Sequence, residues 1–509
     1  MRADFLIPPI AFLAALTAGG SSIAPHGRPF VFNYENVLGT SLELKIGARN
    51  SAAADRADAA ARREIEREAR ILSAWDSASE FSRWVATLGE AVRVSPELFE
   101  TLSLFDEWRE RTGGALDASA ETVVRVWKNA EREGREPSRA ELDAAVNGVR
   151  HPHWKLDRVA QTATHLDRAP IALNSFAKSY IAGHAADAAL AVSSVSSVVV
   201  NIGGDLVVRG PSSELVDIAD PRCDAENCAP LAQVEIQGRA IATSGNYRRG
   251  VDITGRHYSH IVDPRTGMTA ETIISSTVAA PNPADAGAMA TAFSVLTPAE
   301  SQRVARSIPG VDYLIVTNTG ERIASAAWSK LAARAPIRPP VAFLPAAAGP
   351  AAPAVWDPSL SLTVTVDLPQ LDGHARRPYL AIWVEDASKT PVRTIALWYN
   401  KDRYLPEMRA WYRIAQASPI KDTYNFAHSI ASATRSSGKY TFNWDGKDDA
   451  GKLVAPGKYT VFIEAAREHG SYQLMRQEMD FNSTPAKLDL KGNAEIAGAS
   501  LDYHKIAAR

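Results

Sequence analysis

The chain has 509 residues, which is too long for one ordinary hydrophobic core, so two or three domains are expected. Its 56 basic and 58 acidic side chains leave a net charge of −2 at pH 7, with no long run of one sign. This balance argues against a large nucleic-acid-binding surface, and no nucleic-acid partner is expected.

Residues 1–24 have the composition of a secretory signal peptide. Arg2 is followed by an apolar run from Phe5 to Leu16 and then by small residues. The run is too short to cross a membrane, and no later stretch reaches the length of a transmembrane helix. Asp4 and a Pro-Pro pair inside the run are atypical of such peptides. The sequence therefore predicts an exported, periplasmic protein whose mature chain has no membrane span.

Residues 28–335 mix helix and strand patterns, which predicts an α+β domain. Apolar residues at helical spacing predict helices over 52–70, 95–112, 121–132, 138–146 and 174–192. Ser138 with Glu141 three residues later is typical of a capping box. Strands are expected at 30–46, 153–157, 164–167, 198–209 and from residue 277. Gly203-Gly204 inside one of them indicates a bulge or a close approach by another group.

Residues 336–358 are rich in Pro and Ala, which predicts a semi-rigid linker and a domain boundary. Residues 359–509 then alternate apolar and polar residues between turn sequences such as Asp445-Gly446. This pattern predicts an all-β antiparallel sandwich of the immunoglobulin-like kind. No paired acid and base stand out in it, so its Trp and Tyr residues are expected to form its core.

The two cysteines, Cys223 and Cys228, lie in a polar loop with four residues between them. In an oxidising compartment they could close a small loop as a disulfide. Free thiols are the alternative, and a zinc site would need two further ligands nearby.

The densest chemistry of the chain lies in residues 258–267, YSHIVDPRTG, which contain a histidine, a carboxylate, a guanidinium and hydroxyl groups. Pro264 and the Thr-Gly pair after it predict a short strand over 258–262 that ends in a rigid turn.

Two interpretations of this segment remain open. Alternation along the strand would place His260 on one face with Tyr258 and Val262, as part of a catalytic site. Alternatively, Asp263 holds the turn by accepting backbone hydrogen bonds, Arg265 pairs with it, and His260 is a satisfied core histidine.

A series of motifs in chain order resembles the FAD:protein FMN transferase family, often called ApbE, over roughly residues 30–330. The motifs are NVLGT at 36–40, LSAW at 72–75, SE at 79–80, GALD at 114–117, FAKSY at 176–180, NIGGD at 201–205, ATSGNY at 242–247, SHIVDPRTG at 259–267 and AMATA at 288–292. The C-terminal part resembles an exported domain of unknown function that is sometimes fused to flavin transferases.

The resemblance implies an exported enzyme that binds FAD and Mg²⁺ and transfers FMN to a threonine hydroxyl of a partner protein, with release of AMP. His260 is the implied general base, because the pKa of a histidine lies near neutral pH, and Asp263 and Arg265 are the implied catalytic residues beside it. The residues implied to bind the flavin dinucleotide are Leu38, Trp75, Ala115, Leu116, Asp117, Lys178 and Ile261.

The expected metal ligands are Ser175, Asp285 and Thr291. In the family the metal carboxylate stands four residues before the helix threonine, and that position is Gly287 here. Asp285 would replace it if the turn before the helix were longer. Ala172 also stands where the family has an acid.

Three more positions depart from the family pattern: Ala118 for a proline, Ser179 for a glycine and Gly183 for an acid. These departures leave a second hypothesis, a catalytically degenerate exported protein that binds flavin or acts as a scaffold.

Overall fold

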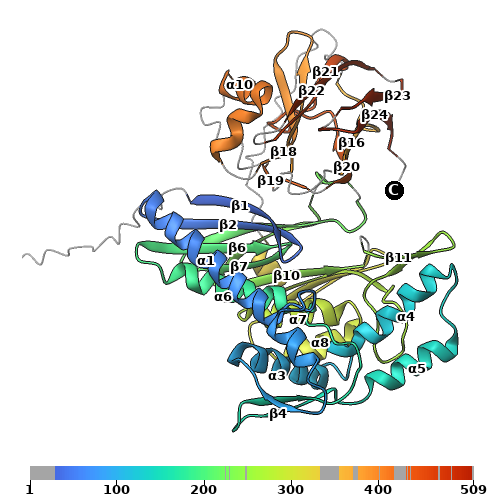
Figure 1. Ribbon diagram of the computed structural model, residues 1–509. Coiled ribbons are helices and arrows are strands. Elements are labelled where there is room, and N and C mark those ends of the chain that lie inside the picture. The colour runs from blue at the N-terminus through green and yellow to red at the C-terminus, as the bar shows by residue number, and fades with distance from the viewer. Residues whose placement is uncertain are drawn as a thin grey trace, which may run out of the picture.

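The computed structural model describes residues 29–332, 355–370, 377–399, 402–417 and 431–506, apart from residues 224, 229, 247, 248, 433, 436, 468–470, 483 and 494. They form an N-terminal α+β unit and a C-terminal β unit (Figure 1). The predicted signal peptide and most of the predicted linker lie outside these residues. Within the described ranges, no helix combines the length and the apolar character needed to span a membrane.

An eight-stranded antiparallel sheet forms the centre of the N-terminal unit, in the order β1-β2-β6-β7-β10-β13-β14-β15. Its strands are β1 (Phe30–Val37), β2 (Thr40–Ala48), β6 (Val195–Ile202), β7 (Asp205–Arg209), β10 (Ala240–Gly245), β13 (Ile273–Ala280), β14 (Asp312–Thr317) and β15 (Arg322–Ala324). Strand β14 is buried along its whole length, because both faces of the sheet are covered.

The stretch 198–209, predicted as one interrupted strand, is two antiparallel strands joined by a tight turn. Gly203 and Gly204 both have positive φ angles, 61° and 99°, as a two-residue hairpin turn of this hand requires. A β-carbon at Gly203 would also meet the side chain of Thr40, so the predicted close approach is confirmed. The turn places Asp205 at the start of β7.

Helices α1 (Ser51–Leu72), α6 (Ala177–Leu190) and α7 (Pro283–Phe293) cover one face of the sheet (Figure 1). They pack closely because small residues line the contact: a β-carbon at Gly183 would lie 2.9 Å from Pro283 Cγ. The other elements on this side are α2 (Glu80–Val85), α3 (Pro96–Arg111), α4 (Glu121–Arg132), α5 (Arg139–Val149), α8 (Pro298–Arg306), β3 (Ala91–Arg93), β4 (Trp154–Asp157) and β5 (Thr162–His165). The predicted capping box of Ser138 and Glu141 is confirmed at the start of α5.

The hairpin of β8 (Ser213–Ile218) and β9 (Ala232–Gln237) and the short helix α9 (Trp328–Leu331) pack against the opposite face. Val234 and Ile236 of β9 are fully buried there. The loop between β8 and β9 carries Cys223 and Cys228, which form a disulfide, as one of the sequence interpretations proposed.

The C-terminal unit consists of two sheets, ordered β20-β16-β24-β23 and β19-β18-β17-β21-β22. Their strands are β16 (Leu360–Leu368), β17 (Tyr379–Asp386), β18 (Pro391–Trp398), β19 (Ala431–Ser432), β20 (Gly438–Trp444), β21 (Gly457–Ala466), β22 (Tyr472–Phe481), β23 (Ala486–Lys491) and β24 (Gly498–Lys505). The predicted all-β unit is confirmed, while its immunoglobulin-like topology stays a prediction. A short helical segment, η2 (Asp402–Glu407) and α10 (Arg409–Ala417), packs beside the second sheet and was not predicted.

Trp356 lies within the predicted linker, but the structure places it in the core of the C-terminal unit. Its ring lies 4.8 Å from that of Trp444 and 5.2 Å from that of Phe481, and only 1% of its surface is exposed. Because Trp356 is part of this hydrophobic core, the C-terminal unit begins before residue 359.

Candidate active site

The segment that carries the candidate histidine follows a hairpin of β11 (Gly250–Ile253) and β12 (Arg256–Ser259). The strand ends at Ser259, where the hydroxyl accepts a hydrogen bond from the backbone N–H of Ile261 at 3.0 Å. Tyr258 and Val262 are buried, whereas His260 is exposed. The predicted strand over 258–262, with all three side chains on one face, is therefore wrong, because the local Ser259 turn ends the alternation.

The His260 ring is held in one tautomer. Its Nδ1 lies 3.0 Å from the carbonyl oxygen of Arg249, which can only accept, so Nδ1 carries the proton and Nε2 carries the lone pair. Desolvation on the protein side of the ring lowers the pKa of His260, and the positive charges of Arg249, His257 and Lys178 lower it further. A neutral imidazole with a lone pair on Nε2 can accept a proton at neutral pH.

Asp263 and Arg265, predicted as catalytic residues, form a brace across the turn. The carboxylate of Asp263 accepts from Nε and Nη2 of Arg265 at 2.9 Å each and from the backbone N–H of Arg265 at 2.9 Å. Glu300 lies 3.5 Å from Arg265 Nη1. Trp127 of α4 donates from Nε1 to the carbonyl oxygen of Gly267 at 2.9 Å. The structure thus gives this pair the turn-holding contacts of the second sequence interpretation.

Lys178 lies in the first turn of α6, where its charge influences both His260 and Asp205. Burial raises the pKa of Asp205, and the ammonium group of Lys178 opposes that shift. The carboxyl of Asp205 also lies close to Ser179 Oγ. Lys178 therefore lies near enough to Asp205 and to His260, from two other parts of the chain, for its charge to affect the pKa of both.

Helices α6 and α7 meet where the metal ligands were predicted. The hydroxyl of Thr291 donates to the carbonyl oxygen of Ser175 at 2.9 Å, so two of the three expected ligands are in contact. Four residues earlier on α7, a β-carbon at Gly287 would collide with Ser179 Oγ. Ser179 thus occupies the space in front of position 287, and its hydroxyl is buried.

Asp285, the third expected ligand, points elsewhere. Six residues of α-helix turn the chain by about 240° and advance it by about 9 Å, so Asp285 and Thr291 lie on different faces of α7. The carboxyl of Asp285 instead faces Trp108 and Arg111 of α3, and burial raises its pKa. Helix α7 already includes Asp285, so the structure does not bring its carboxyl and the Thr291 hydroxyl to the same face of the helix.

The turn at 114–117 is rigid. Gly114 has a φ of 84°, and the carboxylate of Asp117 pairs with Arg109 Nε at 2.7 Å. The segment before α6 is tied to this turn, because the N–H of Ala172 donates to the carbonyl oxygen of Ala118 at 2.9 Å. Predicted flavin-lining residues that lie buried here or in the segment 258–267 are Ala115, Leu116, Asp117 and Ile261.

Trp75, in contrast, exposes 88% of its surface and lines an open cavity of about 420 Å³. The other residues that line the cavity belong to α4 and are mostly cationic or polar: Glu121, Arg125, Lys128, Asn129 and Arg132. Leu38 lies in the β1–β2 turn with a φ of 52°, a conformation that is uncommon for a residue with a β-carbon. An exposed indole beside a helix face with cationic side chains offers a stacking surface for a planar aromatic ring.

In the sequence, Ser179 stood out only as a departure from the family pattern and Asp205 as the last residue of the NIGGD motif. The sequence did contain a signal for Ser179. Relative to the family pattern, position 179 has a larger residue (serine for glycine) and position 287 a smaller one (glycine for an acid). A gain in size at one position and a loss at the other indicates that positions 179 and 287 contact each other. For Asp205, the signal was its place directly after the Gly-Gly turn.

The chain is similar to known protein families, to curated proteins and to solved structures. Residues 38–315 match the model of the ApbE family, and residues 361–498 match a family described as "Predicted periplasmic protein (DUF2271)". The FAD:protein FMN transferase of Klebsiella pneumoniae (strain 342) is 28% identical over 294 residues, which cover 55% of this chain and 82% of that protein. The FAD:protein FMN transferase of Escherichia coli (strain K12) is 31% identical over 226 residues, which cover 42% of this chain and 62% of that protein.

Among solved structures, the ApbE protein of Thermotoga maritima aligns with a TM-score of 0.54 at 24% sequence identity. The alignment covers 60% of this chain and all of that chain. At this identity the similarity establishes a shared fold for the N-terminal unit.

Proposed function

The chain belongs to the ApbE family, and we propose that its N-terminal unit is an FAD:protein FMN transferase. The observation that carries the proposal is His260: the carbonyl oxygen of Arg249 fixes the proton on Nδ1, and desolvation, with the charge of Lys178 nearby, lowers the pKa of the ring. Relatives named FAD:protein FMN transferase support the transfer reaction. His260 and Lys178 supply the base and the positive charge that this reaction requires.

The reaction needs a base at an attacking hydroxyl and positive charge at a pyrophosphate. A threonine hydroxyl of the acceptor protein would give its proton to His260 Nε2 while its oxygen bonds to the flavin-side phosphorus of FAD. The bond between that phosphorus and the bridging oxygen breaks, and AMP leaves with the bridging oxygen. Lys178 would pair with the negatively charged pyrophosphate of FAD, which the transfer cleaves.

The metal that the family implies can be tested against the oxygen atoms present. Thr291 Oγ and the carbonyl oxygen of Ser175 already lie together, and such oxygens suit Mg²⁺. Among the described residues, no hydrogen bond of good geometry reaches the buried Ser179 Oγ, although the carboxyl of Asp205 lies close by. The donor set fits a hard cation if Asp205, rather than Asp285, supplies the carboxylate. When bound, Mg²⁺ would neutralise charge on the two phosphates.

The flavin end of FAD would lie toward the 114–117 turn. We propose that Trp75 stacks on the ring at the cavity beside α4, and that Leu38, Ala115, Leu116, Asp117 and Ile261 border it, as the family resemblance implies. The exported location is supported by the description of the C-terminal family as a predicted periplasmic protein.

The test is transfer of mass to an acceptor. Purified protein is incubated with FAD, Mg²⁺ and a threonine-bearing acceptor domain, and the intact mass of the acceptor is measured. A gain of one FMN, minus water, supports the proposal, and a matched acceptor with the threonine replaced by alanine should gain nothing.

One observation favours the second hypothesis, a flavin-binding or scaffold protein without transfer activity. No carboxylate stands at position 287, and Ser179 fills the space in front of it. Tight FAD binding with no mass gain under Mg²⁺ or Mn²⁺ would establish this alternative in place of the transferase.

A further inference from the structure

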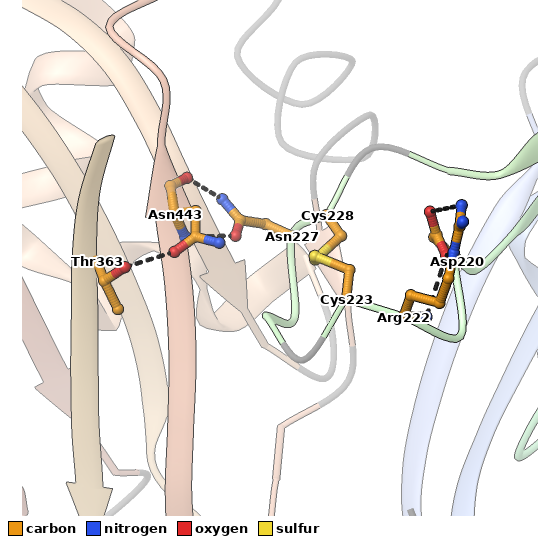
Figure 2. The surroundings of a disulfide bond; sticks show 7 residues. All are labelled: Asp220, Arg222, Cys223, Asn227, Cys228, Thr363 and Asn443. Carbon is orange, nitrogen blue, oxygen red and sulfur yellow. Dashed lines mark hydrogen bonds and ion pairs between the residues drawn. A yellow bond between two sulfur atoms is a disulfide. The ribbon is translucent and has the colours of Figure 1, made fainter. Parts of the chain in front are cut away.

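The loop between β8 and β9, residues 219–231, extends from the N-terminal unit to the C-terminal unit (Figure 2). Its base is closed by the N–H of Leu231, which donates to the carbonyl oxygen of Ile218 at 2.7 Å. Near that base, Arg222 pairs with Asp220 at 3.2 Å. The disulfide between Cys223 and Cys228 closes the outer part of the loop, which carries Glu226 and Asn227.

Two residues inside this closed ring bind the edge strand β20. The N–H of Glu226 donates to the carbonyl oxygen of Thr441 at 2.7 Å. Asn227 contacts Asn443 twice: its Nδ2 donates to the carbonyl oxygen at 2.7 Å, and its Oδ1 accepts from the backbone N–H at 2.7 Å (Figure 2). Glu226 also lies 3.5 Å from Arg435.

The contact uses the free edge of a sheet. Strand β20 is the outermost strand of its sheet and pairs with β16 on one side only. In an antiparallel strand, alternate residues direct their backbone N–H and C=O groups to the same side, so Thr441 and Asn443 present theirs away from β16. The side-chain amide of Asn227 satisfies both backbone groups of Asn443, as a neighbouring strand would.

Glu226 and Asn227, which contact β20, lie between the two bridged cysteines. The disulfide therefore limits the conformational freedom that these two residues lose when they bind β20. A closed ring of this size has few alternative conformations, whereas an open loop would have to be ordered at the interface. We propose that the Cys223–Cys228 disulfide is a redox-controlled clamp that holds the C-terminal unit on the N-terminal unit. A dithiol would open it by giving two electrons and two protons to the two sulfurs and becoming a disulfide itself.

Hydrogen exchange at the backbone amide of Asn443 tests the clamp directly. In the oxidised full-length protein this amide is protected by Asn227. Reduction, or the double variant Cys223→Ser with Cys228→Ser, should speed its exchange by about tenfold or more. The amide of Phe442, which faces β16, should not change. Small-angle scattering of the same samples should show a larger maximum dimension once the clamp opens.

Asn227→Ala is the second variant, because it keeps the disulfide and removes the contact. It should speed exchange at Asn443 in the oxidised protein, and reductant should then add little. Gln233→Ala on β9, where the exposed side chain donates to the carboxylate of exposed Asp217 at 2.9 Å, is the matched control and should behave as wild type. Equal exchange at Asn443 and equal dimensions in the oxidised, reduced and serine-substituted proteins would overturn the proposal. The readouts do not involve flavin transfer, so they are independent of the proposed function.

Discussion

Each of the two units holds a carboxyl group whose pKa is raised by burial, but the surroundings of the two groups differ. In the C-terminal unit, Glu464 is fully buried and accepts from the backbone N–H groups of Ala410 and Trp411 at 2.8 Å each. In the N-terminal unit, Asp205 faces the side chains of Lys178 and Ser179 instead. Glu464 therefore serves the fold, because it caps the first turn of α10 and also interacts with the Tyr472 hydroxyl, whereas the described neighbours of the Asp205 carboxyl are side chains alone.

The difference shows how a structural acid can be separated from a candidate functional one. A carboxyl satisfied by backbone groups fixes those groups in place and has little capacity left for a ligand. A carboxyl beside a lysine and a hydroxyl can exchange those partners for a cation or a substrate at smaller cost to the fold. Substitution of Asp205 should therefore reduce activity, whereas substitution of Glu464 should reduce the stability of the C-terminal unit.

The largest effect is expected for His260→Ala. Because general base catalysis contributes about 10²–10⁴-fold, the rate of FMN transfer should fall by about that factor while FAD binding is retained. Single-turnover transfer followed by intact mass measures the rate, and quenching of flavin fluorescence measures binding. His504→Ala, in the C-terminal unit, is the control, since its ring contacts the local carbonyl oxygen of Asp502 within the same strand, β24. An unchanged rate in His260→Ala would remove the proposed base.

The next effect concerns the two aspartates. If Asp205 supplies the metal carboxylate, Asp205→Asn should weaken Mn²⁺ binding by about tenfold or more, as measured by electron paramagnetic resonance. Asp285→Asn is the matched variant and should leave Mn²⁺ affinity unchanged, because Asp285 faces α3. The reverse result would return the metal to the ligand set expected from the sequence.

The pH dependence should follow from the lowered pKa of His260. Only the neutral imidazole accepts a proton, and the pKa lies below its usual value of 6.5. The rate of transfer should therefore be constant around pH 7 and decline only below pH 6.5, by about tenfold per pH unit at the acid end. A profile of kcat/KM against pH measures this, and a plateau that begins above pH 7 would contradict it.

A smaller effect, on stability alone, is expected for Glu464→Gln. A glutamine presents one acceptor oxygen where two N–H groups need partners, so the C-terminal unit should lose about 1–3 kcal/mol of unfolding free energy. Chemical denaturation measures the loss, and the transfer rate should remain that of wild type. Glu478→Gln is the control, because that side chain forms an exposed ion pair with Lys458 and should change stability by less than about 1 kcal/mol. A loss of transfer activity in Glu464→Gln would contradict the assignment of this acid to the fold.

Local signals in the sequence were sufficient for much of the secondary structure. Helix α1 was predicted at 52–70 and extends over Ser51–Leu72, and Ser138 caps α5 as its capping box indicated. These signals work because a helix depends on contacts between residues three or four positions apart. The pattern was less informative in the C-terminal unit, where β22, β23 and β24 were not predicted.

The sequence by itself determined the family resemblance, the two-unit organisation and the identity of His260 as the candidate base. Only the tertiary structure decided which acid lies near Lys178, because that depends on contacts between distant positions. The contact of Thr291 with Ser175 joins residues 116 positions apart, and the contact of Asn227 with Asn443 joins residues 216 apart. No local pattern specifies such pairs, since they form only when packed helices and strands bring the two segments together.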